Sequence, residues 1–306
     1  MTGPLRLPPG VWLDVPHDAY HADCAECPSL SSSVAKILIS ETPMAAMLAH
    51  PRLNLGFEAE HDSKFDLGSA VHDILASQGK RVEVVEGFDD WKKGDARKKR
   101  DEIRAAGKVP LLTEQWDRAH AIVEVVWVGL AKAAVDLGWQ EAVAVVKDGD
   151  VWLRAMFDGF SNVTITDFKV TGVNLANDTA LARHMVDLGY DLRAAFYLHV
   201  AELAFPELAG RLKFRWVFVQ VDPPHGIRII EADGTWREMG RRKMAHAIAV
   251  WHDCVATGKW PHLEGLPTRI EYPGWSENEW LQREQRLGFV QGPMVTLKAF
   301  DDEDQE

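Results

Sequence analysis

The segment 151–169 restricts the possible folds of this chain more than any other part of the sequence. Two largely apolar runs, 151–160 and 163–169, flank the short polar pair Ser161-Asn162. Apolar runs rich in β-branched residues around such a turn are typical of a β-hairpin. The sequence therefore predicts a β-sheet that contains this hairpin.

Charged residues of this hairpin stand where they can form one site. Because successive side chains of a strand point to opposite faces, Asp167 and Lys169 share one face and Phe168 points away. A neighbouring strand can bring Asp158 to the same place. Two carboxylates and one ammonium suit a divalent cation and a water molecule that attacks a phosphodiester, since hard cations prefer oxygen ligands. The same pattern also fits an ordinary solvated strand face, so the surrounding sequence has to distinguish the two.

The hairpin resembles the PD-(D/E)xK nuclease superfamily, with Asp158 as the first acid and Asp167-x-Lys169 as the second half of the motif. The resemblance implies an α/β, restriction-endonuclease-like core with a central mixed β-sheet flanked by helices, plus helical additions. It also implies that these three residues are catalytic and that Mg²⁺ is the cofactor, with Mn²⁺ able to replace it. Lys169 would position the water, stabilise charge at the phosphorus or act as a general base with a lowered pKa.

A second motif precedes the hairpin. Residues 65–75 have the spacing of an amphipathic helix. Their Phe-Asp-Leu-Gly-x-x-x-His pattern resembles the histidine motif of RecB-type and RecE-type members of the superfamily. The resemblance makes His72 a metal ligand together with Asp158 and Asp167. The alternative is a hydrogen-bonded histidine of the core.

A third motif follows the hairpin. Residues 189–198 resemble the helix that RecB-like nucleases carry after the lysine, usually with a Gln-x-x-x-Tyr pattern. Tyr197 matches the tyrosine, whereas Arg193 stands where glutamine is expected. Both residue types hydrogen-bond phosphate, but arginine adds a fixed charge. We expect Tyr190, Arg193 and Tyr197 to contact DNA, and inward packing of an amphipathic helix is compatible with that role.

Taken in order, the motifs resemble the RecE-like exonuclease VIII of phages over roughly residues 10–275, from the Ser-rich segment 28–38 to Trp260-Pro261. This resemblance implies a Mg²⁺-dependent exonuclease that degrades one strand of duplex DNA from a 5′ end and leaves a 3′ overhang. The implied partners are DNA ends, a RecT-like single-strand annealing protein and further copies of the chain in a ring. Two alternatives remain, a RecB-type single-strand DNA nuclease and a non-catalytic DNA-end or partner-binding protein that kept the fold.

Other charged residues are candidates for the same site. Glu141 begins the strand-like run 141–146 and is either an additional catalytic residue or a solvated strand end. Arg154 alternates onto the same face as Asp158, where it can pair with a site carboxylate or touch a phosphate. The basic segment 92–108 is predicted to be a helix, and its residues Lys98, Lys99 and Arg100 are candidates for phosphate contacts.

The composition is compatible with these expectations. The net charge is −12, and five of the acids stand in the C-terminal segment 301–306. A site that binds a metal needs clustered acids, so the negative charge does not exclude a nuclease. No run of about 18 apolar residues occurs, and the N-terminus lacks the pattern of a secretory signal. We therefore expect a soluble cytoplasmic protein, in the host cytoplasm if phage-encoded, without a membrane partner.

Four potential zinc ligands, His17, His21, Cys24 and Cys27, stand within eleven residues. Structural zinc sites use such ligands. This spacing leaves no loop or helix to build around the ion, so we do not expect zinc there. Three cysteines are also too few for a disulfide framework or an iron–sulfur cluster.

The motifs predict one exonuclease domain, residues 1–275, with a helical part at 28–137 and a catalytic sheet core at 138–235. Residues 276–306 are predicted to form a peripheral helix and an acidic tail. Within the domain we expect helices at 28–50, with a second short helix starting at Pro43, and at 111–137, 189–198 and 236–257. Further strands are expected at 214–221 and 227–230. No phosphate-binding loop of an ATPase occurs, so the chain does not supply its own motor.

Overall fold

The hairpin segment is divided between two sheets in the computed structural model. Strand β5 (Val151–Phe157) pairs antiparallel with β4 (Ala142–Asp148), whereas β6 (Gly159–Ser161) pairs antiparallel with β7 (Thr164–Thr171). The turn between β6 and β7 contains Asn162 with φ of 52°, a left-handed conformation that asparagine tolerates. The predicted hairpin is therefore confirmed for β6 and β7. Its first strand was predicted too long, because the chain changes sheet at Asp158.

The sheet that carries the motif is mixed, as the sequence predicted. Its order is β6-β7-β8-β9. Strand β8 (Lys213–Gln220) runs parallel to β7, and β9 (Ile227–Glu231) runs antiparallel to β8. A second sheet has the order β1-β4-β5, with β1 at Gly10–Trp12, and a third contains β2 (Val82–Val85) parallel to β3 (Val109–Leu112).

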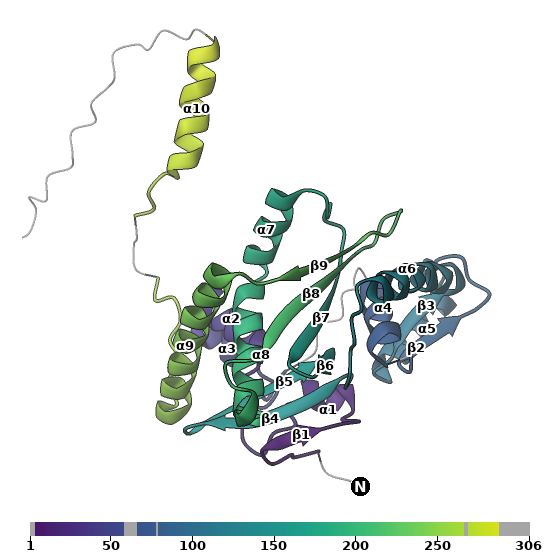
Figure 1. The fold of residues 1–306 in the computed structure, drawn as a ribbon, viewed down its shortest axis with the longest axis horizontal. Helices are drawn as coiled ribbons and strands as arrows, with labels where there is room; N and C mark the ends of the chain where they lie inside the picture. Colours follow the sequence, from purple (N-terminus) through teal and green to yellow (C-terminus); the bar gives the residue numbers. More distant parts are fainter. Residues whose placement is uncertain (1–3, 58–65, 78, 266–268, 288–306) are drawn as a thin grey trace, which may run out of the picture. The chain divides into compact units, whose positions relative to one another are not determined.

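Helices cover both faces of the four-stranded sheet. Helices α8 (Tyr190–Ala204) and α9 (Gly234–Thr257) lie on one side, and α4 (Asp66–Ser77) and α6 (Thr113–Lys132) lie on the other (Figure 1). Strand β8 alternates accordingly. Its Phe214, Trp216 and Phe218 belong to the core under α8 and α9, while Val217 and Val219 belong to the core under α4 and α6. A sheet buried on both faces explains the nearly continuous apolar sequence of this strand.

The remaining helices include one, α10, that belongs to the C-terminal segment of the chain. They are α1 (His17–His21), α2 (Ser32–Ser40), α3 (Pro43–Leu48), α5 (Gly94–Ala105), α7 (Asp178–Asp187), the 3-10 turn η2 (Pro206–Leu208) and α10 (Gly274–Leu287). Side chains of Ser31 and Thr42 cap α2 and α3. The helix predicted at 111–137 is shorter, because residues 109–112 pair with β2 as a strand.

The structure describes residues 4–57, 66–77, 79–265 and 269–287. The chain divides into two compact units, Met1–His262 and Leu263–Glu306. All elements from β1 to α9 belong to the first unit. The acidic tail expected at 301–306 lies outside the described residues.

Candidate active site

The two acids of the motif meet because of the β6–β7 register. Gly159 lies opposite Thr166 in this antiparallel pair. Continuing the register by one residue places Asp158 opposite Asp167. The Phe168 backbone N–H donates to Asp158 Oδ2 at 2.8 Å. Both acids are buried, with Asp158 only 6% and Asp167 0% exposed. The break between β5 and β6 thus turns the Asp158 carboxylate toward β7.

His72 reaches the same place from α4. This helix packs on β7, where a Cβ at Gly68 would lie 3.8 Å from the Val170 Cβ, and His72 follows one turn later. His72 Nε2 lies 3.0 Å from Asp158 Oδ2. Burial opposes the charged form of His72, but Asp158 outweighs it, so the pKa of His72 is raised. Burial likewise opposes ionisation of Asp158, and the stronger effects of His72 and Lys169 hold its pKa well below the usual range.

Lys169 points back along its own strand. Its ammonium forms an ion pair with Asp167 Oδ2 and donates to the Phe168 carbonyl at 2.9 Å. It also lies over the Tyr190 ring, 5.5 Å from the centroid. Burial lowers the pKa of Lys169, Asp167 opposes this effect, and Arg193 adds to it. A lysine with a lowered pKa is more readily neutral, and a neutral lysine accepts a proton.

Arg193 joins the site from the first turn of α8. Its Nη1 lies 3.5 Å from Asp167 Oδ1, and its guanidinium stands over the Tyr197 ring at 5.9 Å. About a third of its side chain, 32%, is exposed. Arg193, at the position where glutamine is expected, therefore interacts with one of the two acids. The exposed part of its side chain is accessible from solvent.

The donor atoms of this site suit a hard divalent cation. They are carboxylate oxygens of Asp158 and Asp167 and one imidazole nitrogen of His72, a combination that Mg²⁺ and Mn²⁺ accept. Asp167 Oδ2 is buried and has no hydrogen-bond partner, although the Lys169 ammonium lies against it. Within the described residues, no three His, Cys, Asp or Glu side chains are already close enough together to hold a metal ion. A cation would have to displace the His72–Asp158 and Lys169–Asp167 contacts.

Glu141 stands at the margin of the site. It precedes β4 with φ of 51° and lies 3.7 Å from Arg81. Burial raises its pKa and Arg81 opposes this, while His72 and Asp158 also act on it electrostatically. Glu141 therefore belongs to the electrostatic surroundings of the two acids, and its catalytic role stays a prediction.

The structure corrects the expectation for Arg154. Its guanidinium lies 3.1 Å from Asp23 Oδ1 and donates to Ser29 Oγ at 2.9 Å, and only 4% of the side chain is exposed. It therefore pairs with an acid far earlier in the sequence instead of Asp158, and its burial excludes a phosphate contact. Strand alternation predicted that Arg154 shares a face with Asp158. This prediction is wrong because the chain changes sheet after β5, and alternation holds only within one continuous strand.

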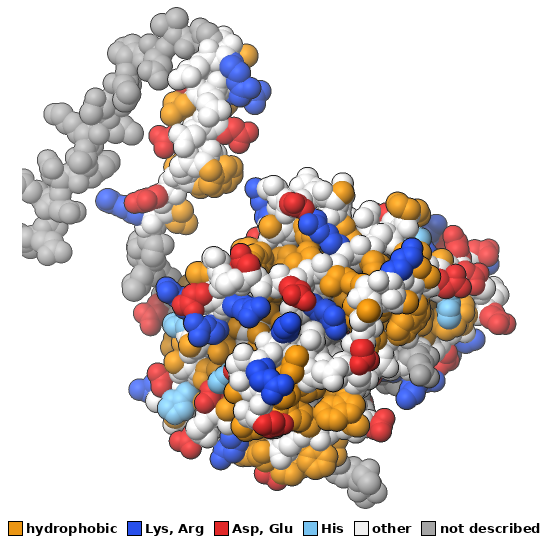
Figure 2. Space-filling model, viewed as in Figure 1, with side chains coloured by type: hydrophobic (Ala, Val, Ile, Leu, Met, Phe, Trp, Pro, Cys, Tyr) orange, Lys and Arg blue, Asp and Glu red, His pale blue; other side chains and the backbone are white. Residues whose placement is uncertain are grey.

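The basic helix α5 packs on β2 and β3. Lys98 and Lys99 are exposed, and Arg100 pairs with Asp101 at 2.9 Å. On the face drawn in Figure 2, basic and acidic side chains are interspersed on the surface of the main unit. A role of α5 in DNA binding stays a prediction.

Sequence reasoning missed the proximity of α1 to the catalytic acids. The Nε2 atoms of His17 and His21 lie 3.1 Å apart. Burial, with help from His21, lowers the pKa of His17 to about 2, and His72 and Asp158 also act on it. Cys24 is buried and Cys27 is exposed. In the sequence, the spacing of these residues was weighed as a zinc site, which was not expected, and gave no indication of their distance from the nuclease motif.

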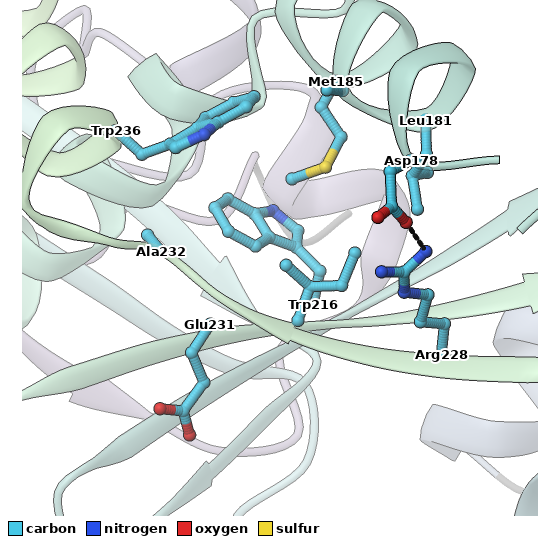
Figure 3. A pocket seen from close by; sticks show the side chains of 10 residues that line it. Asp178, Leu181, Met185, Trp216, Arg228, Glu231, Ala232 and Trp236 are labelled. Atoms are coloured by element: carbon cyan, nitrogen blue, oxygen red, sulfur yellow. Dashed lines mark hydrogen bonds and ion pairs between the residues drawn. The ribbon is translucent and has the colours of Figure 1, made fainter. Parts of the chain in front are cut away.

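A cavity of about 160 Å³ opens between α7, β8 and β9. Figure 3 shows the rings of Trp216 and Trp236 and the Met185 side chain around it, with Arg228 bonded to Asp178 at 2.6 Å. None of His72, Asp158, Asp167 and Lys169 lines this cavity. Its wall is mainly the apolar core, so it offers little to a charged substrate.

A mixed sheet with two acids, a lysine and a helical histidine at one point defines the PD-(D/E)xK class of nuclease folds. The chain belongs to the family described as a PDDEXK-like domain of unknown function, whose model matches residues 31–267. Among solved structures, a "Putative exonuclease" from Eubacterium rectale is similar in fold, with a TM-score of 0.58 and 14% sequence identity. The match covers 86% of this chain and 96% of that one. No curated protein matches.

These comparisons confirm the predicted superfamily and fold class. The narrower resemblance to RecE-like enzymes stays a prediction. Among the described residues, no helix has the length and apolar character needed to cross a membrane.

Proposed function

We propose that this protein is a Mg²⁺-dependent exonuclease that degrades duplex DNA from 5′ ends and leaves 3′ single strands for annealing. The observation that carries the proposal is the pairing of His72 with Asp158 and of Lys169 with Asp167, with both acids buried on neighbouring strand positions. Three separate segments contribute these residues, and an ordinary solvated strand face would not bury two acids and a lysine together.

The residues divide the chemistry among them. A divalent cation, when bound through His72, Asp158 and Asp167, supplies Lewis-acid stabilisation of the scissile phosphate. Lys169 in its neutral form accepts a proton from the attacking water, because its lowered pKa leaves it less fully charged. The water oxygen forms a bond to phosphorus as the bond to the leaving sugar oxygen breaks. Arg193 contacts a phosphate oxygen and offsets its negative charge.

The direct test uses linear duplex DNA labelled at either end, with Mg²⁺ present. We expect release of 5′-labelled nucleotides first, and an Asp167→Asn variant should lose about a hundred- to a thousandfold in rate. Asp150→Asn is the matched control, since Asp150 is an exposed acid in the β4–β5 turn. Absence of nucleotide release by the native protein, or equal rates in both variants, would overturn the enzyme proposal.

Two further arms separate the alternatives. Preference for single-stranded over duplex DNA would favour a RecB-type nuclease, and DNA-end binding without cleavage would favour a non-catalytic role. Thermal unfolding with Mn²⁺ tests the metal separately. We expect the midpoint to rise for the native protein and to stay unchanged for an Asp158→Asn variant, because a ligand that binds only the folded state stabilises it.

An annealing partner and a ring-like oligomer complete the proposal. An enzyme without an ATPase motor remains on its substrate most simply by enclosing it, which favours a closed oligomer. Sedimentation of the native chain tests this part. A monomer at working concentrations, with processive digestion, would exclude enclosure as the source of processivity.

A further inference from the structure

A second cavity, of about 300 Å³, has Glu141 and the end of α4 in its lining. Its lining comes from three segments, which are the residues after β1, the end of α4 and the residues before β4. Ala76 lines it and stands four positions, about one helical turn, after His72 on α4. Glu141 lines it as well, and its charge acts on both His72 and Asp158. The cavity therefore adjoins the turn of α4 that follows His72.

Trp139 is a fixed aromatic surface in the cavity wall. Its backbone N–H donates to the Phe160 carbonyl at 2.9 Å, and its own carbonyl accepts from Phe160 at 2.8 Å. Its ring packs against the rings of Phe160 and Phe205, both with centroids 6.1 Å away. Nevertheless 47% of Trp139 is exposed. An anchored and exposed indole loses little conformational entropy when a flat ligand stacks on it.

The charges around the cavity are suited to a nucleotide and not to a free anion. Lys80 is exposed in the lining and carries a positive charge. Asp14 and Glu141 carry acidic groups in the same lining, and Glu141 faces Arg81 at 3.7 Å. Leu13 and Val15 add apolar surface. A ligand that combines an aromatic ring with one phosphate fits this mixture, whereas a ligand with phosphates alone would meet the acids.

We propose that this cavity holds the nucleotide next to the scissile phosphate, with its base stacked on Trp139 and its outer phosphate beside Lys80. The inference rests on the proposed nuclease function and assigns a substrate subsite to it. Stacking on an aromatic ring is tolerant of base identity, so the subsite positions any DNA sequence. It also adds binding energy away from the reacting phosphorus, which improves the alignment of that phosphate with the catalytic acids.

Binding can be measured apart from cleavage. The probe is a labelled oligothymidylate of four nucleotides, titrated with the Asp167→Asn protein so that no cleavage occurs. Adding Trp139→Ala should weaken binding about five- to a hundredfold, whereas Trp139→Phe should retain most of it. Trp127→Ala is the matched control, because Trp127 is similarly exposed, at 43%, on α6 and does not line the cavity.

A second measurement changes the probe. For the protein that keeps Trp139, removing a single base from the oligonucleotide should weaken binding as much as Trp139→Ala does, and at one base position only. The affinity of the Trp139→Ala protein should not change when that base is removed. The subsite proposal would be overturned if the protein that keeps Trp139 bound the intact probe and every abasic probe equally well. This measurement remains decisive even if Trp139→Ala does not fold.

The subsite and the nuclease proposal fail in different ways. If the native protein cleaves DNA but neither Trp139→Ala nor base removal changes binding, the subsite is wrong and the nuclease stands. If cleavage is absent but binding depends on Trp139 and on one base, the subsite stands as a DNA-binding site and the nuclease proposal is wrong.

Discussion

At the scale of single residues, Arg193 is where this chain departs from the Gln-x-x-x-Tyr pattern of RecB-like nucleases. A glutamine there would be neutral, whereas Arg193 lies 3.5 Å from Asp167 and keeps a third of its side chain exposed. Its charge both competes with a cation for Asp167 and attracts phosphate. Where glutamine is expected, this chain therefore has a residue with a fixed positive charge, which under the proposed function would strengthen the attraction for DNA.

We predict that Arg193→Gln makes DNA binding less dependent on salt. One fewer phosphate contact should reduce the slope of log affinity against log salt by about one, with little effect on folding. Titrations of Asp167→Asn and of the Asp167→Asn/Arg193→Gln protein at several salt concentrations measure this slope. Arg211→Gln, a change at an exposed arginine after η2, is the control. An unchanged slope would show that Arg193 does not touch a phosphate.

Asp23 has a structural role that its sequence position did not indicate. This fully buried acid accepts a hydrogen bond from Ser29 Oγ at 2.6 Å and pairs with Arg154 at 3.1 Å and with His50 at 3.4 Å. Burial opposes its ionisation, but His50 and Arg154 outweigh this and hold its pKa below the ordinary 3.8. The contribution of Asp23 to stability is therefore present above about pH 4 and is lost as the pH falls through its folded pKa.

We predict that the free energy of unfolding falls steeply below pH 4, because Asp23 must then take up a proton and lose its partners. In Asp23→Asn the protein should be less stable at pH 7, by about 3 kcal/mol, since Arg154 is left buried beside a neutral group. The loss on acidification should also be smaller in that variant. Urea unfolding at pH 7 and pH 3.5 measures both effects. An Asp150→Asn control with the same pH dependence as Asp23→Asn would contradict the assignment.

At the scale of elements, the close packing of α8 on α9 determines where Arg193 and Tyr197 lie. Gly240 of α9 faces the backbone of α8, and a Cβ there would lie 2.1 Å from the Asp191 carbonyl oxygen. Lys243 of α9 also pairs with Asp191 at 2.6 Å. Backbone atoms of α8 cannot rotate away as a flexible side chain can. Any side chain at position 240 would therefore push α8 and α9 apart.

Gly240→Ala is therefore expected to destabilise the protein by about 1–3 kcal/mol and to reduce DNA cleavage by shifting α8. Gly234→Ala, in the first turn of the same helix, has open space around the new Cβ and serves as the control. Thermal unfolding and cleavage rates of both variants provide the measurement. If the two variants were equally stable, the close contact at Gly240 would not contribute to the free energy of unfolding, which would contradict the prediction.

At the scale of the whole molecule, the helix that the structure describes in Leu263–Glu306 is mostly exposed. Helix α10 contains no buried residue. Apolar burial is the main source of stability, so a segment that buries none contributes little to folding. The site residues and both cavities belong to Met1–His262.

A chain ended at residue 273 should accordingly keep its thermal midpoint within about 2 °C of the full chain. Its rate on short duplexes should also be unchanged. Differential scanning calorimetry and the cleavage assay check these two expectations. A drop of 5 °C or more would show that the C-terminal unit stabilises the first one.

The sequence by itself predicted the helices around His72 and Arg193, the strands β6, β7 and β8, and the spacing of the nuclease-like motif. Strand alternation set Asp167 and Lys169 on one face, and helical spacing brought His72 one turn beyond Gly68, because both depend only on neighbours a few residues away. The resemblance to a nuclease superfamily followed from these local patterns and their order, and the family match and the mixed sheet confirm it.

The tertiary structure alone decided which distant residues meet. The change of sheet at Asp158 buried Arg154 against Asp23, 131 positions earlier, and separated it from the site. Chain packing also brought α1 near the acids and joined the end of α4 to Trp139 in one cavity. Such contacts depend on the packing of segments far apart in the chain, which no local periodicity encodes.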